Sequence, residues 1–370
     1  MSNALSRRAA LQALGIMGGS GLLARIAGAQ EARGKIKLRP VQVSRSRVVR
    51  TIVGLRPFRA SGYVVRSERL GEKTVVHHYG HGGCGVTLSW GTAELAVAEV
   101  ASAGARAAAV LGCGAVGLAT ARLLQRRGIE ATIYARELPP NTLSDVAGAR
   151  WYPFDLFDSK VVSPEMVEGV WRASRVAYAA FKRMAGPTYG VFFRPTYMFQ
   201  NSPLPKTSLL NLDSPVRDCL PGLRELLPEE NPTPAKVTRT FETMMIEPAI
   251  YLPAVMRDHA KAGGRVVKRE FRSAAELAEL KEPVIVNCTG MGAATLFGDT
   301  ELVPIKGQLT ILKPQPEIDY VALPNGLYMF PRKDGIVLGG TFERGVSTME
   351  PNRAAEERIL TRHAKFFATL

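Results

Sequence analysis

The sequence predicts an α/β fold of about two domains, and three observations lead to this prediction. The chain has 370 residues, 46% of them hydrophobic and 35 of them glycine, as in ordinary globular α/β proteins. Two apolar stretches, "KTVVHHYGHGG" and "RAAAVLGCG", run directly into glycine-rich turns. A helical pattern follows each turn, so the order strand, glycine turn, helix occurs twice in succession.

The N-terminal residues 1–29 predict a targeting segment that does not belong to the fold. The stretch "LSRRAALQALGIMGGSGLLARIAGAQ" resembles a twin-arginine export leader, with Arg7 and Arg8 as the pair and Leu11 near the apolar position. Small residues precede a cleavage site expected after Ala29. The resemblance implies an exported protein, periplasmic or secreted. The alternative is an amphipathic N-terminal helix.

The remaining elements follow from periodicity and from helix start and stop signals. The basic segment 38–61 predicts extended structure and turns, and a helix after the first glycine turn should end at Gly104. Further predicted elements are a helix starting at Ser163-Pro164 and ending at Gly186-Pro187, a helix and strand within 247–271, a strand in "PVIVNCTG" and a hairpin about Asp334-Gly335.

The formal net charge of +15 is spread along the chain and is not gathered in runs with interleaved aromatics. This distribution favours a generally basic surface, which attracts anionic substrates or an anionic membrane face, over a nucleic-acid site.

Cysteine and histidine usage predicts no metal site. Cys84, Cys113, Cys219 and Cys288 are far apart and are expected to be buried free thiols, although an oxidising compartment would permit one disulfide. His77, His78 and His81 are close in sequence, but their spacing fits no metal-ligand set.

The second glycine turn carries the spacing of a dinucleotide-binding site. In "VLGCGAVGLATARLL", Gly112, Gly114 and Gly117 follow a strand and open a helix. These glycines allow a tight turn, close approach of a pyrophosphate and close helix packing. An acidic ribose ligand is expected about twenty positions later, where Glu137 stands beside Arg136. The alternative is a glycine turn that binds no ligand.

The stretch "HHYGHGGCGVTLSWGTA" closely resembles the signature of D-amino acid oxidases, which are FAD-dependent enzymes. The segments "RTIVGLRPFRASG", "NTLSDVAGARW", "VIVNCTG" and "YMFPRKDGIVLGGTF" are similar to that family as well. The resemblance implies a Rossmann-type FAD-binding domain with a parallel sheet and a substrate domain with a mixed sheet.

The order of these segments differs from that of the family. "GLRPFR" and "HYGHGG" usually come last, but here they precede the glycine turn that usually opens the chain. We therefore expect a circular permutation, since chain termini that lie close together tolerate such rearrangement. The expected boundaries are 67–150 and 236–300 for the FAD-binding domain and 38–66, 151–235 and 301–370 for the substrate domain.

The resemblance also implies roles for single residues. Arg56 matches the arginine that binds the substrate carboxylate, a role that suits a bidentate guanidinium. Tyr328 matches a tyrosine that hydrogen-bonds the same carboxylate, and Gly83 matches a residue whose carbonyl receives the substrate amino group. A second family tyrosine would fall at Pro324, which suggests an altered entrance or substrate range.

The expected FAD contacts come from both glycine turns and from three further segments. Arg136 stands where an acidic ribose ligand is frequent, which puts the adenosine contact in doubt, and Asp145 is expected to cap a helix. The expected contacts are Gly82, Gly83, Gly85, Val86, Thr87, Gly112, Gly114, Ala115, Val116, Gly117, Arg136, Glu137, Leu143, Ser144, Arg150, Phe271 and Gly290.

The resemblance implies an oxidase that transfers hydride from the Cα of a D-amino acid to flavin N5 and yields a 2-oxo acid, ammonia and hydrogen peroxide. Positioning and exclusion of water matter more here than a dedicated base. The alternatives are an exported D-amino acid dehydrogenase that uses a quinone or carrier, a D-aspartate-preferring oxidase, and a flavin-binding protein without catalysis. No additional basic residue can be placed in the pocket from the sequence. A homodimer is possible, and no membrane span is expected after leader removal.

Overall fold

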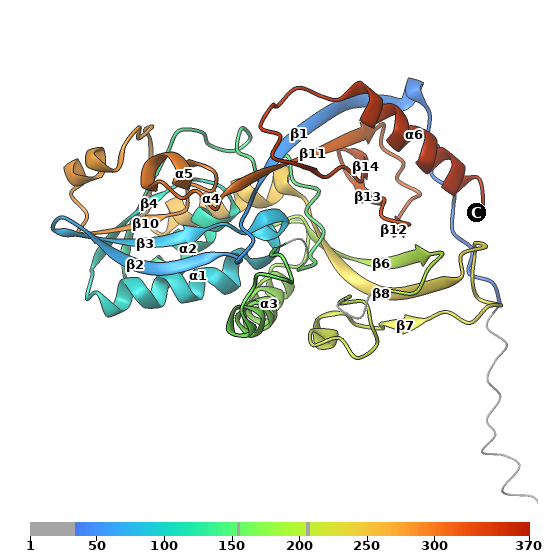
Figure 1. Cartoon of the computed structure of the whole chain (residues 1–370), viewed down its shortest axis with the longest axis horizontal. Helices are drawn as coiled ribbons and strands as arrows, with labels where there is room; N and C mark the ends of the chain where they lie inside the picture. Colours follow the sequence, from blue (N-terminus) through green and yellow to red (C-terminus); the bar gives the residue numbers. More distant parts are fainter. Residues whose placement is uncertain (1–33, 154–155, 205–207) are drawn as a thin grey trace, which may run out of the picture.

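The computed structural model describes residues 34–153, 156–204 and 208–370. The predicted leader, including Arg7, Arg8 and the site after Ala29, lies outside the described residues. Two β-sheets with their helices form two halves that lie side by side in Figure 1. The predicted α/β class with mixed sheets is confirmed.

The first half is a six-stranded sheet in the order β2-β3-β10-β4-β5-β9. All neighbouring strands are parallel except β2, which pairs antiparallel with β3 at the edge. Its elements are β2 (Val64–Leu70), β3 (Lys73–Tyr79), η2 (Gly82–Cys84), α1 (Gly85–Ser102), β4 (Ala107–Leu111), α2 (Ala115–Arg126), β5 (Glu130–Ala135), α4 (Pro248–Lys261), β9 (Arg265–Lys268), η4 (Ala274–Glu279), β10 (Val284–Asn287) and α5 (Gly292–Phe297).

Both faces of this sheet are covered, which explains why its central strands β10 and β4 are almost entirely apolar. Val76 and Val110 pack with α1 and α2 on one face, and Ala109 and Ile285 pack with Leu277 of η4 on the other. The carboxyl ends of β3, β10 and β4 therefore meet at one edge of the sheet, directly before the two glycine turns.

The second half is a nine-stranded sheet with the path β1-β11-β14-β13-β12-β6-β8-β7, from which β15 branches at β11. Its elements are η1 (Arg45–Arg47), β1 (Val48–Phe58), β6 (Val191–Gln200), η3 (Arg217–Cys219), β7 (Arg224–Glu225), β8 (Val237–Ile246), β11 (Val303–Leu312), β12 (Val321–Pro324), β13 (Tyr328–Arg332), β14 (Gly335–Gly339), β15 (Glu343–Arg344) and α6 (Arg353–Phe367). Helix α3 (Pro164–Arg183) was expected in the substrate domain, but it packs against α1 of the first half.

The two faces of this sheet have different coverings. Helix α6 packs Ile359, Leu360 and Phe367 against one face, as Figure 1 also shows. The opposite face carries a separate apolar cluster that includes Leu309 and Phe330. This second face is the one on which the predicted substrate residues lie.

Local sequence signals placed most element boundaries correctly. Helix α3 begins at Pro164, and the hydroxyl of Ser163 accepts a hydrogen bond from the backbone N–H of Met166. The helix ends at Arg183, three residues before the predicted stop at Gly186. Arg332 pairs with Gly335, so the hairpin turn is Lys333-Asp334, one residue earlier than predicted.

One strand lies outside the predicted domain boundary. The range 236–300 was expected in the FAD-binding half, but β8 at its start pairs with β6 along its whole length in the nine-stranded sheet. The ladder between β6 and β8 has ten consecutive residue pairs, from Val191 with Ile246 to Gln200 with Val237. On its other side β8 pairs with β7, so both neighbours of β8 belong to the nine-stranded sheet.

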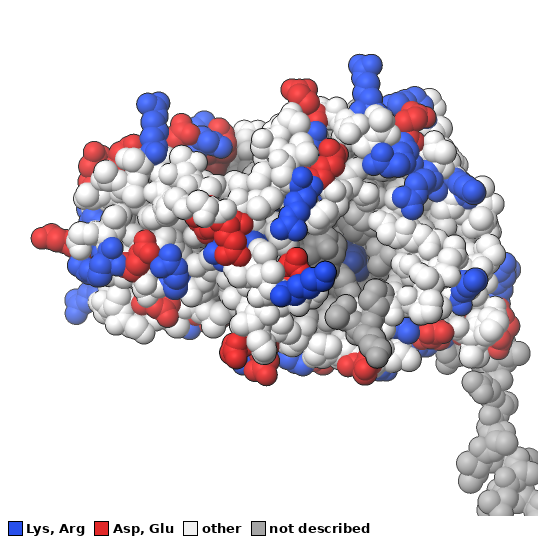
Figure 2. Space-filling model, viewed as in Figure 1, with Lys and Arg blue, Asp and Glu red and all other residues white. Residues whose placement is uncertain are grey.

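Charges of both signs alternate over the visible surface (Figure 2), in keeping with the scattered Lys and Arg of the sequence. All four cysteines are free; three are buried and Cys288 is half-buried. Among the described residues, no helix is both long and apolar enough to cross a membrane, and no cluster of His, Cys, Asp or Glu is arranged to hold a metal ion.

Candidate active site

The second glycine turn joins β4 to α2 and is built so that no larger residue fits. A Cβ at Gly117 would lie 2.0 Å from the carbonyl oxygen of Gly112, and one at Gly112 would lie 2.6 Å from the carbonyl oxygen of Cys288. Gly112 also has a φ of +108°, which glycine adopts without strain. The backbone N–H groups at the start of α2 therefore remain approachable, as an anion site at a helix N-terminus requires.

The first glycine turn lies next to the second. Gly83 is exposed in η2 while Cys84 beside it is buried, and a Cβ at Gly85 would lie 3.9 Å from Cγ2 of Val116 at the start of α2. Strands β3 and β4 are not direct neighbours, because β10 lies between them and pairs with both. The two turns meet all the same, because all three strands end at the same edge.

Buried histidines hold the first turn against both helices. His78 Nδ1 lies 3.0 Å from Thr120 Oγ1 of α2, and its Nε2 lies 2.8 Å from Thr92 Oγ1 of α1. His81 Nε2 also contacts Thr92 Oγ1, at 2.9 Å. Burial lowers the pKa of His81 to about 3, so its ring is neutral at physiological pH. These histidines therefore have a structural role.

The loop 141–151 connects the glycine turns to the nine-stranded sheet. The Ser144 hydroxyl accepts a hydrogen bond from the N–H of Ala115, the first residue of α2, at 3.0 Å. Further along, the carbonyl of Ala149 accepts from Ile246 N–H at 2.9 Å. Asp145 accepts from the N–H and hydroxyl of Thr142, and so closes a turn inside the loop.

Three glycines clear one face of the nine-stranded sheet for this loop and for two predicted site residues. Gly54 pairs with Gly307 across β1 and β11, and the register of Thr310 with Leu338 places Gly339 on the same face. A Cβ at Gly54 would lie 2.8 Å from Val146, one at Gly307 2.8 Å from the Arg56 guanidinium, and one at Gly339 2.0 Å from the Tyr328 ring.

Arg56 and Tyr328 therefore lie on the same face of the sheet. Gly307 and Leu309, the β11 residue opposite Gly339, are two positions apart, which corresponds to about 7 Å along the strand. Tyr328 stacks on Phe330 with ring centroids 4.7 Å apart. The two residues predicted to hold one carboxylate are brought together by the fold.

The two arginines of "GLRPFR" have opposite electrostatic environments. Arg59 is neutralised by Asp299 at 3.0 Å and Glu301 at 2.7 Å. The Arg56 guanidinium makes one long hydrogen bond, 3.4 Å to the carbonyl of Thr341, and lies 5.8 Å from the centre of the Phe342 ring. It forms no ion pair with any described carboxylate, so Arg56 keeps its charge available for an anion.

Arg150 links the two halves of the site. Its guanidinium lies over the Tyr152 ring at 4.4 Å, and its Nε and Nη1 are buried without a hydrogen-bond acceptor among the described residues. Burial is the largest influence on this group and lowers the pKa of Arg150 to about 10, with Tyr152, Cys84 and Tyr328 near enough to oppose that shift. Cys84 of the first glycine turn contacts the Tyr152 carbonyl with its Sγ at 3.8 Å, and Gly148 lies against Phe330, on which Tyr328 stacks, so the loop that carries Arg150 touches both regions.

The other predicted contacts lie around the glycine turns. Arg136 and Glu137 are exposed just after β5, with Arg136 paired to Glu270 at 3.2 Å, and Leu143 is exposed on the loop. Gly290 has a φ of +58° and lies beside Pro57. Val86 and Thr87 are buried in α1, and the Thr87 hydroxyl lies 3.4 Å from both the backbone nitrogen and the carbonyl oxygen of Tyr152. Half-buried Phe271 packs edge-on against Tyr134.

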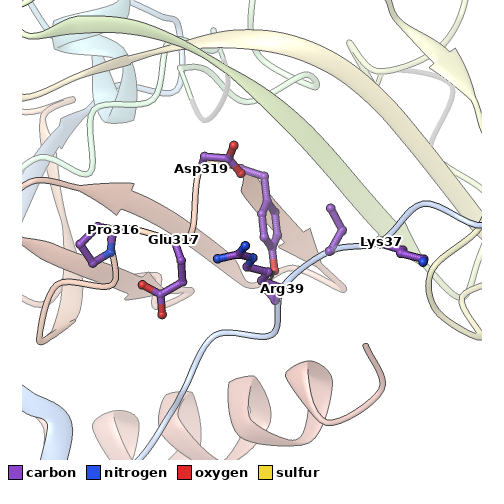
Figure 3. Close-up of a pocket in the computed structure, with 7 residues that line it drawn as sticks. Lys37, Arg39, Pro316, Glu317 and Asp319 are labelled. Carbon is purple, nitrogen blue, oxygen red and sulfur yellow. Dashed lines mark hydrogen bonds between the residues drawn. The ribbon is translucent and has the colours of Figure 1, made fainter.

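A hollow elsewhere on the surface does not share these features. Figure 3 shows it between the N-terminal segment with Lys37 and Arg39 and the loop with Pro316, Glu317 and Asp319. Its charges are of both signs, and none of its lining residues belongs to the glycine turns or to the face with Arg56. We therefore place the active site at the junction of the two halves.

Sequence reasoning missed the three glycines Gly54, Gly307 and Gly339 and the unpaired state of Arg150. Glycines inside apolar strand patterns were the signal for the first three, since a strand glycine often marks a close approach. The environment of Arg150 depends on which residues the fold brings near it, and no local pattern encodes that.

The described residues fit a dinucleotide cofactor that reaches from α2 toward the nine-stranded sheet. The glycines at 112, 114 and 117 leave the α2 N-terminus open for a pyrophosphate, and Ser144 lies beside it. The exposed backbone at Gly83 and the face with Arg56 and Tyr328 lie farther along, where a planar ring system would meet its substrate.

Comparison with known proteins agrees with this geometry. The D-amino-acid oxidase of Rubrobacter xylanophilus is 33% identical over 266 residues, which cover 69% of this chain and 75% of that protein. The D-amino-acid oxidase of Streptomyces coelicolor is 29% identical over 261 residues, covering 69% of this chain and 76% of that protein.

Among solved structures, the glycine oxidase of Geobacillus kaustophilus has a TM-score of 0.53 at 16% identity. The match covers 70% of this chain and 76% of the glycine oxidase chain. The FAD-bound L-α-glycerophosphate oxidase of Mycoplasma pneumoniae has a TM-score of 0.52 at 14% identity, covering 72% and 79%. These likenesses concern the fold. The family model for FAD-dependent oxidoreductases matches residues 107–370, well over half of the sequence, and the chain belongs to this DAO family of FAD-dependent oxidoreductases.

Proposed function

We propose that this protein is an FAD-dependent oxidase of D-amino acids. The observation that carries the proposal is the arrangement of Arg56 and Tyr328 on one face of the nine-stranded sheet, at the junction with the two glycine turns. An arginine without a carboxylate partner beside a tyrosine hydroxyl suits an α-carboxylate. The D-amino-acid oxidases of Rubrobacter xylanophilus and Streptomyces coelicolor support the substrate class.

Each residue then has a defined task. Arg56 binds the α-carboxylate through its guanidinium, and Tyr328 donates a hydrogen bond to the same group. The carbonyl of Gly83 accepts a hydrogen bond from the amino group, which must be unprotonated to react. Bound FAD would supply the acceptor for the hydride that leaves Cα and the means to return its two electrons to oxygen. No described His, Asp or Glu is required as a base, since orientation supplies much of the rate.

The test is a panel of D-amino acids assayed for hydrogen peroxide and 2-oxo acid under air, with the L-enantiomers as controls. Equal amounts of peroxide and 2-oxo acid from D-amino acids alone support the oxidase. Turnover only with an artificial acceptor such as a quinone would replace the oxidase with a dehydrogenase. Failure of every D-amino acid to bleach the flavin without oxygen would refute the substrate class.

We also propose that the chain is a circular permutation of the family fold. The family match begins at Ala107 in β4, whereas the first glycine turn and β3 precede it and join the same sheet through β10. Leu38 and Leu370 pack against the same apolar cluster. A variant with residues 34–106 moved behind residue 370 through a short linker should therefore fold and bind FAD. An insoluble product would contradict the permutation.

Export is a further proposal, based on the N-terminal "LSRRAALQALG". Arg7 and Arg8 direct the folded protein across the membrane, and a double substitution by lysine should retain it in the cytoplasm. Normal export of the lysine variant would show that the leader has another nature.

A further inference from the structure

Arg150 is a half-buried residue whose guanidinium has no anionic partner among the described residues. Its Nε and Nη1 are enclosed and have no acceptor, and it forms no ion pair with any carboxylate in the part of the chain that the structure describes. The Tyr152 ring at 4.4 Å offsets part of the cost of burial through a cation–π contact, but a ring provides no hydrogen-bond acceptors for these N–H groups. A charge in this state favours the binding of an anion.

The neighbours of Arg150 place that anion in the substrate site. Gly148, two residues before Arg150, lies against the Phe330 ring, and Phe330 stacks on Tyr328 with ring centroids 4.7 Å apart. Tyr328 shares a sheet face with Arg56. The backbone of Arg150 forms a bridge with Met245 in β8, on the side of the sheet away from β1. Arg56 thus comes from β1 at one end of the nine-stranded sheet, and Arg150 comes from a loop beside β8 near the other end.

Two unpaired guanidinium groups at one site favour a substrate with two carboxylates. Arg59 shows that this chain neutralises an arginine where the charge is only structural, since Asp299 and Glu301 both bind it. Within the ranges that the structure describes, neither Arg56 nor Arg150 has such a partner. A D-amino acid with a neutral side chain fills one of these sites and leaves the donors of Arg150 unsatisfied, which disfavours its binding.

We propose that Arg150 binds the side-chain carboxylate of an acidic D-amino acid while Arg56 holds the α-carboxylate. Arg150 is then the residue that determines specificity within the proposed D-amino acid oxidation, and the inference rests on that function. The sequence offered no second basic residue for the pocket, and the fold supplies one from the loop that was expected to contact FAD.

The test compares substrates of equal shape and different charge, namely D-aspartate with D-asparagine and D-glutamate with D-glutamine. We expect the FAD-loaded parent to prefer the acid of at least one pair at least tenfold in kcat/KM. Arg150→Met should lower that ratio at least tenfold, and Arg150→Lys should lower it less. Arg172→Met on α3 removes the same charge from an exposed position, where its side chain is 73% accessible, and should leave the ratio unchanged.

A second measurement does not depend on turnover. Succinate or glutarate should raise the Tm of the parent more than propionate does, and Arg150→Met should remove this difference. The methionine variant should fold, because replacing an unpaired buried charge with an apolar side chain of similar length relieves desolvation. Its Tm without ligand should equal or exceed that of the parent.

The failures of the inference and of the function can be told apart. A parent that oxidises the amides or D-alanine at least as well as the acids refutes the role of Arg150 and leaves the oxidase intact. Loss of FAD from Arg150→Met, or an equal loss of activity on acid and amide, shows that Arg150 serves the cofactor and overturns the inference. Oxidation of no D-amino acid refutes the function itself, and the dicarboxylate Tm shift then tests Arg150 alone.

Discussion

Replacing Arg56 with alanine should weaken substrate binding without loss of flavin. The guanidinium lies over Gly307 and makes one long bond of 3.4 Å to Thr341, so most of its donor capacity is available to a carboxylate. A hydrogen bond to a charged group contributes about 1.5–3 kcal/mol, and each 1.4 kcal/mol is tenfold in affinity, which gives a KM increase of about 10- to 150-fold. Arg56→Lys should recover only part of this loss, because an ammonium lacks the planar fork.

The assay is steady-state peroxide formation with the best D-amino acid of the panel, at a flavin content checked by visible absorbance. Gly307→Ala is a companion variant, because its Cβ would lie 2.8 Å from Nη2 and 2.9 Å from Cζ of Arg56 and would displace the flexible end of that side chain. It should raise KM several-fold with little change in Tm. Parent-like kinetics of flavin-loaded Arg56→Ala would remove Arg56 from the site and refute the reasoning.

Three further predictions concern stability and cofactor. Gly91→Ala would place Cβ 1.9 Å from the carbonyl oxygen of Ala173 and force α1 and α3 apart, which should cost about 1–3 kcal/mol by denaturant unfolding. Gly117→Ala would place Cβ 2.0 Å from the Gly112 carbonyl oxygen and should reduce FAD content, measured as flavin released by heat, since we expect no covalent link. His81 has a folded pKa of about 3 against about 6.5 when unfolded, so this residue alone should lower the free energy of unfolding by about 1.4 kcal/mol for each pH unit below about 6.5.

Matched controls separate these effects from general damage. Gly34→Ala meets nothing within 4 Å and should leave both Tm and FAD content unchanged. His81→Gln should flatten the pH dependence by about one proton, whatever its effect on stability at pH 7. An unchanged pH slope in His81→Gln would contradict the pH prediction. FAD content in Gly117→Ala equal to that of the parent would contradict the cofactor prediction, and FAD that stays with the denatured chain would contradict the expected non-covalent binding.

The elements that the sequence predicted well are those with local chemical signals. The Ser163 cap, the proline after it and the spacing of Gly112, Gly114 and Gly117 act within a few residues, so they can be read without the fold. The insertion of β10 between β3 and β4 could not be predicted in this way, because parallel pairing joins distant parts of the chain. Asn287 of β10, for example, pairs with His77 of β3, 210 positions away in the sequence.

The residues of the candidate site also fall into two groups, those marked by short sequence motifs and those whose state depends on long-range packing. Arg56 and Tyr328 were identified because short motifs surround them, and the fold brings them to one face. The charge state of Arg150 and the path of the loop across Gly54 depend on long-range packing. Burial without a partner is a property of the folded chain and has no counterpart in the order of residues.

The three glycines under Val146, Arg56 and Tyr328 also decide how this enzyme can change its substrate range. The space above Gly54, Gly307 and Gly339 is already filled by these three side chains, so every substitution there displaces one of them. Mutant libraries directed at these positions should therefore yield variants with smaller substrates or none. Variants that accept bulkier side chains should come instead from Arg150 and Tyr152, whose long side chains can be shortened.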